Sequence, residues 1–299
     1  MRRTTCLMAG IIMLGSAVAG VGVGTAGAST PPPGPTFTCA GTLSAPEPIP
    51  AGTYSALMVP AGSICQIPGP GAVTVLSSVL VGRGGGLVMT GPGDLKIVGN
   101  VTVADGGAFA AALKSEKKTS VSILGSVSVR NDGAFYLGTE VPHGPIFANI
   151  QGSVQGLSPS AVVIQNVAIG GSATVRGGGA LNAVVEAITH NSPFSNYTDF
   201  EDDQVKGSVT EVGYGGIWGG VIRTIIRHAL TFAYNSEATI DEYDIGSDII
   251  FGSAYCAGND PTPNTGHSTG APSLVYGTTF GDQAATCTGV PGGGTGPVG

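Results

Sequence analysis

Charged and aromatic residues are both scarce in this sequence. Of the 299 residues, 10 % are charged and 6 % are aromatic, with a single Trp, whereas about a quarter of the residues in an ordinary soluble domain are charged. With 12 Lys and Arg against 19 Asp and Glu, the chain lacks the clustered positive charge that nucleic-acid binding requires. Good helix formers are also few, which excludes a helical bundle.

Gly and Pro are abundant instead. The chain contains 51 Gly and 20 Pro, but Gly does not recur at every third position, which excludes collagen. The low charge and the many Val, Ile and Leu residues argue against a disordered chain, because such a composition can bury apolar surface. We therefore predict an all-β protein with many turns.

The first 28 residues have the pattern of a secretory signal peptide. Arg2 and Arg3 precede an uncharged apolar stretch at 7–24, and small residues at 26–28 form a cleavage site. We predict cleavage after Ala28 and a secreted, extracellular product, exported by either the general or the twin-arginine route. A retained membrane anchor is the alternative, although about 18 residues is marginal for spanning a bilayer. No second long apolar run follows, so no membrane span is expected after cleavage.

Four cysteines remain once this leader is removed. They are Cys39, Cys65, Cys256 and Cys287, and an even number in an exported chain indicates disulfides. Three pairings are possible, and the local pairs Cys39–Cys65 and Cys256–Cys287 are favoured because two cysteines lie near each end. A zinc site is the alternative, but the chain has no CxxC motif and no nearby pair of histidines. We expect no metal here.

A nine-residue pattern occurs four times. The copies begin at Val79, Val101, Val127 and Ala173, and each has Val at the third place, Gly at the seventh, Gly or Ala at the eighth, and Leu or Phe at the ninth. The starts are separated by 22, 26 and 46 residues. The last interval is twice 23, which predicts a degenerate copy around residues 150–156.

Each copy predicts one coil of a single-stranded parallel β-helix, or β-solenoid. The Val-x-Val part is a strand with one face buried, the Gly residues form a corner, and the Leu or Phe enters the interior from the next strand. Stacking of the coils should align equivalent residues. The expected columns are Val81, Val103, Val129 and Val175, and Leu87, Phe109, Phe135 and Leu181. An antiparallel sandwich with shared Gly turns is the alternative, but the regular steps near 23 residues argue against it.

The chain after the leader is expected to divide into three parts. Residues 29–70 form a Pro-rich N-terminal cap, because Pro cannot donate to a sheet ladder and hinders edge pairing. The parallel β-helix occupies 71–255, with its last coil near 248–254. Residues 256–299 form a C-terminal cap and a flexible tail.

Several short motifs resemble a known group of proteins. The motifs are Cys39, Ala-Gly-Thr-Tyr at 51–54, Val-Pro-Ala-Gly-Ser-Ile-Cys at 59–65, Gly-Asn-Val-Thr-Val at 99–103, and an Asn/Pro loop between Cys256 and Cys287. They are similar to the start, coils and end of secreted actinobacterial β-helix proteins. The resemblance covers most of the chain after the leader. It implies a right-handed parallel β-helix and a secreted location, but no reaction.

Segment 186–248 departs from the repeat and carries most of the acidity. It holds 11 of the 19 acidic residues and only three basic ones, Lys206, Arg223 and Arg227. The acidic run at 201–203 is the best candidate for paired catalytic carboxylates, with Arg223, Arg227 and His228 as basic partners. An inverting hydrolase needs two carboxyl groups about 6.5–9.5 Å apart.

Other features weaken an enzymatic interpretation of this segment. The His-Gly dipeptide at 143–144 precedes the acids, whereas pectin hydrolases have it in another order, together with an Arg-x-Lys motif that is missing here. Asp241, Glu242, Asp244 and Asp248 offer oxygen ligands for calcium, but they do not form a calcium-loop motif. We therefore interpret the acids as a solvated face, and expect no catalytic residue, metal or cofactor.

Two classes of function remain. The first is a non-catalytic β-helix, structural or adhesive at the cell envelope or outside it, with envelope or extracellular polysaccharide as its candidate partner. The second is a polysaccharide lyase or hydrolase with its site in 186–248. A groove lined by Asp202, Trp218 and Arg223 would favour the second class, whereas scattered outward acids would favour the first.

Overall fold

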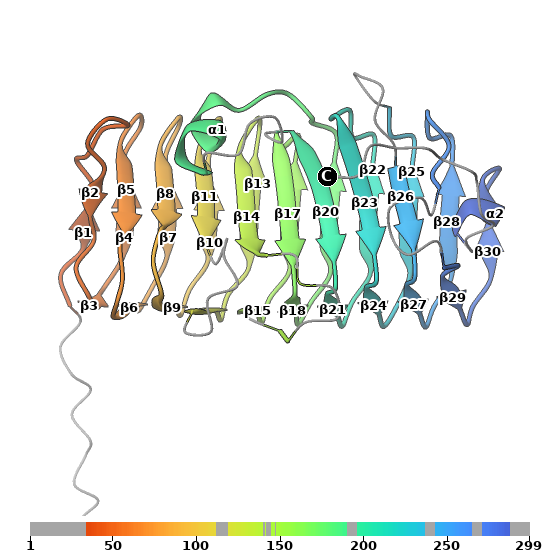
Figure 1. Cartoon of the computed structure of the whole chain (residues 1–299), viewed down its shortest axis with the longest axis horizontal. Helices are drawn as coiled ribbons and strands as arrows, with labels where there is room; N and C mark the ends of the chain where they lie inside the picture. The colour runs from red at the N-terminus through yellow and green to blue at the C-terminus, as the bar shows by residue number, and fades with distance from the viewer. Residues whose placement is uncertain are drawn as a thin grey trace, which may run out of the picture. The chain divides into compact units, whose positions relative to one another are not determined.

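The chain folds into stacked parallel β coils. The computed structural model describes residues 34–111, 119–139, 141, 145–146, 148–189, 196–236, 243–264 and 271–287. All of them belong to the unit Pro33–Gly299, and the predicted leader at 1–28 lies outside them. The coils make about nine turns and place their strands in three parallel sheets (Figure 1). The predicted parallel β-helix is therefore confirmed.

The three sheets follow one another in chain order within a coil. Sheet 1 contains β1 (Phe37–Thr38), β4 (Leu57–Val59), β7 (Val79–Val81), β10 (Val101–Val103), β13 (Val127–Arg130), β16 (Val154–Leu157), β19 (Ala173–Arg176), β22 (Val209–Val212), β25 (Leu230–Ala233), β28 (Ala254–Ala257) and β30 (Thr279–Phe280). Sheet 2 contains β2 (Glu47–Pro48), β5 (Ile64–Ile67), β8 (Gly86–Met89), β11 (Ala108–Ala111), β14 (Ala134–Gly138), β17 (Ala161–Gln165), β20 (Tyr197–Glu201), β23 (Trp218–Ile222) and β26 (Tyr243–Gly246). Sheet 3 contains β3 (Gly52–Tyr54), β6 (Ala72–Val75), β9 (Gly93–Ile97), β12 (Thr119–Ile123), β15 (Ala148–Ile150), β18 (Val167–Ile169), β21 (Gln204–Val205), β24 (Ile225–Ile226), β27 (Ile249–Ile250) and β29 (Leu274–Val275).

The repeat sets the register of sheet 1. Val103 pairs with Val81 on one side and with Val129 on the other. Val129 pairs in turn with Gly156, which pairs with Val175. The four valines are fully buried. The predicted column is confirmed, and β16 is the predicted degenerate copy, in which Gly takes the place of Val.

The second predicted column is only partly correct. Phe109 pairs with Leu87 and with Phe135, and the two Phe rings stack with centroids 5.1 Å apart. The next member is Val162, whereas Leu181 is 68 % exposed. The assignment of Leu181 was wrong because the chain leaves the coil path after β19 and forms the helix α1 (Ala183–Thr189) before it re-enters at β20.

Helix α1 lies on the outer face of sheet 2, in contact with β8 and β11 (Figure 1). Glycines 177–179, with φ of 62°, 102° and 98°, turn the chain out of the coil. Asn182 caps the helix, because its Oδ1 accepts hydrogen bonds from the N–H groups of Val184 and Val185. Val185 and Ile188 are buried in a second apolar cluster outside the main core. The outer face of sheet 2 is therefore covered in these coils.

The coils extend beyond the predicted boundaries of 71–255. Strands β1 to β5 lie in the region predicted to be a cap, and they pair in the same ladders as later strands. Leu57 and Val59 are buried like the Val-x-Val residues, and Gly62 turns the corner with a φ of 70°, but Ser63 and Cys65 stand where the pattern has Gly and Leu or Phe. Pro48 is tolerated because β2 lies at the edge of sheet 2. The ladders continue after residue 255 through β29 and β30, and the short helix α2 (Ala284–Cys287) contacts β28 and β30.

One predicted disulfide is present in the first coils. Cys39 and Cys65 are bonded, with their Cα atoms 5.9 Å apart, which confirms this pair. Cys256 is also disulfide-bonded. The side chain of Cys287 lies outside the described residues, so the pair Cys256–Cys287 stays a prediction.

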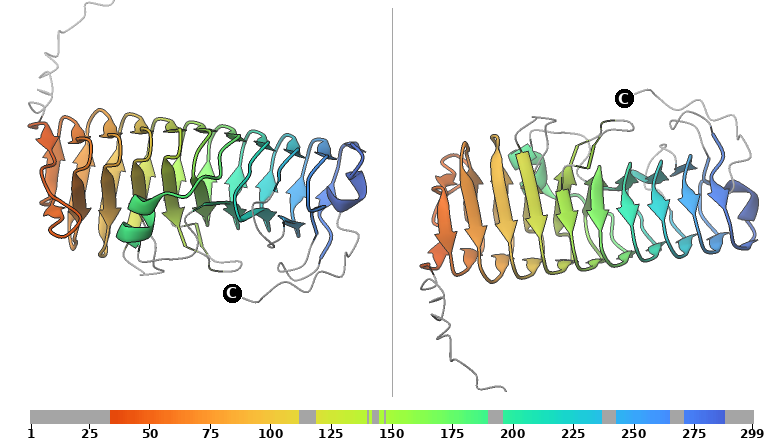
Figure 2. Two further views of the ribbon diagram at one scale, coloured as in Figure 1. Left: turned by 90° about the horizontal axis from the view of Figure 1, so that it is seen from above. Right: turned by 90° about the horizontal axis from the view of Figure 1, so that it is seen from below.

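Side chains at the corners connect successive coils. The N–H of Ser153 donates to Oγ of Ser126, that of Ser172 to Oγ of Ser153, and that of Ser208 to Oγ of Ser172, at 3.1–3.2 Å. Such bonds satisfy backbone N–H groups that the strand ladders leave unpaired. The views in Figure 2 show that coil after coil repeats the same corner. Equivalent residues of successive coils are therefore stacked at the corners as well as in the core.

Candidate functional site

Most described acids of segment 186–248 are buried, so the prediction of a solvated acidic face was wrong. Seven of the eight are at most 9 % exposed: Asp199, Glu201, Asp202, Asp203, Glu211, Asp244 and Asp248. The eighth, Glu186, is partly buried in α1. Asp241 and Glu242 of the calcium hypothesis lie outside the described residues. The buried acids divide into three groups: Glu201 and Asp202 with Arg223, Asp199 and Asp244 on sheet 2, and three others, of which Glu211 lies in the core and Asp203 and Asp248 at a corner.

The corner pair is bound by Arg223. Nε of Arg223 donates to Oδ1 and Oδ2 of Asp202 at 3.0 and 3.1 Å, and Nη2 donates to Oδ2 at 2.9 Å. Nη2 also donates to the carboxylate of Glu201. The three side chains are 5–8 % exposed. Such a multidentate Arg–carboxylate arrangement fixes both partners in place, so Asp202 and Glu201 are held as structural ions.

Two further acids lie on the outer face of sheet 2. Asp199 and Asp244 both pair with Gly220, which lies between them in the ladder. At about 4.8 Å for each ladder step, their Cα atoms are about 10 Å apart. Nε2 of Gln165 donates to Oδ2 of Asp199 at 2.5 Å. The ring of Trp218 lies over Gly220, because a Cβ at that position would overlap the indole carbons.

The groove that would favour an enzyme does not assemble as predicted. Asp202 and Arg223 meet, as proposed from the sequence. Trp218, however, begins β23 and Arg223 follows its end, so the two side chains lie at opposite ends of that strand. Arg227 and His228 follow β24 and are exposed at another corner of the coil. They contribute nothing to the acidic corner.

Glu211 lies in the interior of the solenoid. It occupies the valine column of sheet 1, between Val175 and Phe232, and is fully buried. Burial raises the pKa of Glu211 to about 8, an effect that the neighbouring Thr198 hydroxyl partly offsets. The carboxyl group is therefore mostly protonated at neutral pH. Its position in the column identifies Glu211 as a core residue.

Asp203 and Asp248 are buried at the corner between sheets 2 and 3. Oδ1 of Asp203 accepts a hydrogen bond from the N–H of Val167 at 2.8 Å. Oδ1 of Asp248 accepts one from the N–H of Thr224 at 2.9 Å, and Oδ2 accepts one from Oγ of Ser273 at 3.0 Å. Burial raises the pKa of both carboxyl groups well above the ordinary value. These two acids link coils, as the serines do at another corner.

A basic and aromatic surface lies at the corner between sheets 3 and 1. We define the basic–aromatic edge as Lys206, Arg227, Phe251 and Tyr276, each of which directly follows a strand of sheet 3. The N–H groups of the last three each donate to a carbonyl of the preceding coil, so the four lie in successive coils. All four are exposed: Phe251 by 43 % and Tyr276 by 63 %.

Arg227, Phe251 and Tyr276 of this edge form a stack. Cζ of Arg227 lies 4.6 Å from the ring centroid of Phe251. The rings of Phe251 and Tyr276 are nearly parallel, with centroids 5.2 Å apart and an interplanar angle of 11°. Sequence reasoning missed this edge because its members are more than 20 residues apart in sequence, and only the stacking of coils brings them together.

A second aromatic group lies on the outer side of sheet 1. The rings of Tyr255 and Phe280 have centroids 5.1 Å apart, and the hydroxyls of Tyr234 and Tyr255 are 3.1 Å apart. Tyr234 is 60 % exposed and Phe280 50 %. Exposed aromatic residues therefore collect in the last coils, whereas Phe109 and Phe135 of the earlier coils are buried.

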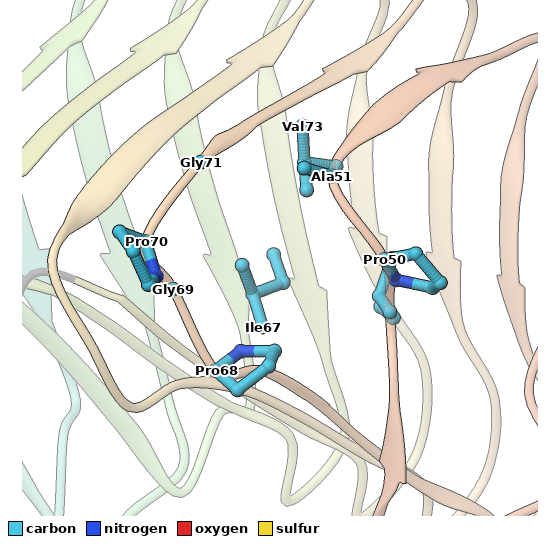
Figure 3. A pocket seen from close by; sticks show the side chains of 9 residues that line it. Pro50, Ala51, Ile67, Pro68, Gly69, Pro70, Gly71 and Val73 are labelled. Carbon is cyan, nitrogen blue, oxygen red and sulfur yellow. The ribbon is translucent and has the colours of Figure 1, made fainter.

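An apolar cavity of about 210 Å³ lies between the first coils. Pro50, Pro68 and Pro70 line it together with Ile, Ala, Gly and Val residues (Figure 3). Its lining contains no ionisable side chain, so it offers no acid, base or nucleophile for catalysis.

Cys39, Glu47 and Cys65 are the described residues whose potential ligand atoms come close enough together to suggest a metal. Both sulfurs are joined in the disulfide, and Glu47 accepts a hydrogen bond from the N–H of Ala40. A disulfide sulfur is not the thiolate that a metal binds. The group is therefore a structural staple near the first edge of the sheets.

The sequence was compared with family models, curated proteins and solved structures. No family model, no curated protein and no solved structure matches the sequence. The resemblance to secreted actinobacterial β-helix proteins therefore rests on the sequence motifs alone. Neither of the described helices has the length and apolar character needed to cross a membrane.

Proposed function

We propose that this chain is a secreted, non-catalytic β-helix protein with a structural or adhesive role at the cell envelope or outside the cell. The observation that carries the proposal is the ion pairing of Arg223 with Glu201 and Asp202. These acids were the best catalytic candidates in the sequence, and all three side chains are nearly buried. Glycoside hydrolysis needs one carboxyl group that delivers a proton and a second that faces the sugar or a water. Acids held by a buried arginine suit neither role.

The interior acids support the same proposal. Glu211 is a core residue, and Asp203 and Asp248 bond backbone N–H groups of the preceding coil. Asp203 and Asp248 satisfy these N–H groups, and Glu211 fills space in the core. Most described acids of segment 186–248 therefore have a structural role in the solenoid.

The disulfides support the secreted location. Cys39 and Cys65 are bonded to each other, and Cys256 is also disulfide-bonded. Disulfides persist in oxidising compartments, mainly outside the cytosol. Together with the leader pattern at 1–28, they favour export.

A polysaccharide lyase or hydrolase is the second candidate, and one observation favours it. Asp199 and Asp244 face the same side of sheet 2 across Gly220, with the indole of Trp218 between them. Their Cα separation of about 10 Å is comparable with the carboxyl spacing of about 6.5–9.5 Å in inverting hydrolases. The two side chains are at most 3 % exposed, which places this candidate second.

Turnover assays separate the two candidates. The purified protein is incubated with neutral and acidic polysaccharides, with and without calcium, and new reducing ends and unsaturated products are measured. We expect no turnover on any substrate. Turnover that is lost in Asp199→Asn or Asp244→Asn, but kept in the matched variant Asp105→Asn at an exposed corner, would overturn the non-catalytic proposal.

A further inference from the structure

We propose that the basic–aromatic edge binds an acidic polysaccharide, a uronate-containing chain that lies along the stack of coils. The inference rests on the proposed extracellular role and names its partner. The edge is formed by Lys206, Arg227, Phe251 and Tyr276, which occupy one corner of four successive coils.

In the coils that carry this edge, most acidic side chains are buried and most basic side chains are exposed. Segment 186–248 has a large excess of acids, but seven of its eight described acids are buried. Of its three basic residues, Arg223 is buried with the acids, whereas Lys206 and Arg227 are exposed on the edge. His228, next to Arg227, is also exposed. The edge therefore presents positive side chains on an acidic protein, which makes it complementary to an anion.

The stack prepares Arg227 for a carboxylate. Phe251 lies against the guanidinium group at 4.6 Å, a contact that lowers the entropy lost when arginine binds a ligand. The guanidinium N–H groups lie in the plane of the group, so a stacked arginine can still donate two parallel hydrogen bonds to a carboxylate. Lys206 supplies a second positive charge from the preceding coil, whose backbone lies about 4.8 Å away. Phe251 is thus a positioning residue, and Lys206 and Arg227 carry the charge.

Tyr276 supplies the apolar part of the surface. It is the last member of the stack and is 63 % exposed. Sugar rings have an apolar C–H face, and an exposed aromatic ring can cover such a face while its hydroxyl bonds to the sugar. A polymer that carries both carboxylates and apolar ring faces therefore matches the edge. A phosphate polymer matches only its charges, and nucleic acid requires a larger cluster of Lys and Arg.

Affinity electrophoresis tests this assignment with polygalacturonate as the probe. The protein is run in native gels that contain polygalacturonate, neutral galactan or polyphosphate, and retardation is measured at low and high salt. We expect retardation by polygalacturonate alone, weaker at high salt because the contact is partly ionic. No retardation by polygalacturonate, or equal retardation by polyphosphate, would overturn the proposal.

Variants separate the edge from the total charge of the protein. The double variant Lys206→Ala/Arg227→Ala and the single variant Tyr276→Ala should each weaken binding at least tenfold. Arg130→Ala removes an exposed arginine from another corner and should leave binding unchanged. An equal loss in Arg130→Ala, or none in the double variant, would overturn the proposal. Melting curves check the fold, and Arg227→Gln tests the charge alone if Tyr276→Ala is unstable.

The same samples keep the two proposals distinguishable. Shortening of the polygalacturonate by the wild-type protein would overturn the non-catalytic function, whatever the binding result. Absence of binding without turnover would overturn the edge as a uronate surface and leave the non-catalytic function standing.

Discussion

Asp202 and Arg223 occupy the same corner of two successive coils, and both have a left-handed backbone, with φ of 55° and 51°. Their ion pair is thus produced by the repeat itself, because the corner turns both side chains the same way one coil apart. L residues with a side chain rarely adopt this conformation. The pairing of opposite charges at the corner, together with the bond to Glu201, stabilises the geometry that the turn requires.

Removal of Arg223 should be costly. In Arg223→Ala, Glu201 and Asp202 would stay buried without their basic partner, and such a change costs about 3–5 kcal/mol. Urea unfolding followed by circular dichroism measures the free energy of unfolding. Arg130→Ala is the matched control, and its exposed position predicts a change within about 0.5 kcal/mol. A loss below about 1 kcal/mol in Arg223→Ala would show that the corner does not depend on the ion pair.

The stability of the protein should fall as the pH rises through about 8, because of Glu211. Its pKa is about 8 in the folded protein and 4.5 in the reference state. A raised pKa means that the folded state holds a proton that the unfolded state releases above pH 4.5, so stability is full below that pH and decreases through the folded pKa. In Glu211→Gln, the free energy of unfolding should fall less between about pH 5 and about pH 9. An equal fall in both proteins would contradict the core assignment.

Two repeat positions give a matched test of the coil register. Phe109 and Leu181 both hold the ninth place of the pattern, but Phe109 is fully buried and Leu181 is 68 % exposed. Phe109→Asp places an unpaired charge in the core and should abolish folding. Leu181→Asp should change stability by less than about 0.5 kcal/mol. A soluble, cooperatively melting Phe109→Asp protein would be incompatible with the register.

Non-reducing peptide mapping should recover two local disulfides. Cys39–Cys65 is present in the structure, and we expect Cys256 to pair with Cys287. A loop of about 26 residues predicts a loss of about 3–4 kcal/mol when Cys39–Cys65 is removed by Cys→Ser changes. A peptide that joins Cys39 to Cys256 would contradict both the pairing and the separation of the two ends by the stack of coils.

The parts of the fold that the sequence predicted are those in which one short pattern determines the structure. Val81, Val103 and Val129 share a spacing and a neighbouring Gly corner, so their column results from the repeat. Leu181 has the same pattern but is exposed, because its Gly corner leads into a helix, which the nine residues do not encode. The coil that begins with Leu57 and Val59 departs from the pattern, because Ser63 and Cys65 replace its Gly and its Leu or Phe, so the first boundary was placed too late.

The candidate sites were harder to predict, because they depend on contacts between coils. Burial of Glu211 cannot be inferred from its neighbours in sequence, since it results from pairing with Val175 and Phe232. The contact of Arg227 with Phe251 likewise can be predicted only when the length of each coil is known. Because the coils differ in length, the sequence alone does not show which residues of successive coils lie next to each other, although it does indicate the strands.

The serine corner has a consequence for how such a chain changes in length. Successive serines at 126, 153, 172 and 208 are separated by 27, 19 and 36 residues, yet each makes the same bond to the next. The bond therefore fixes the distance between successive coils and does not depend on the number of residues in a coil. The longest of these intervals holds α1, which leaves and returns without disturbing the serines. The solenoid is modular in this sense: a foreign loop grafted in place of α1 would be displayed from a fixed frame whose height the graft does not alter.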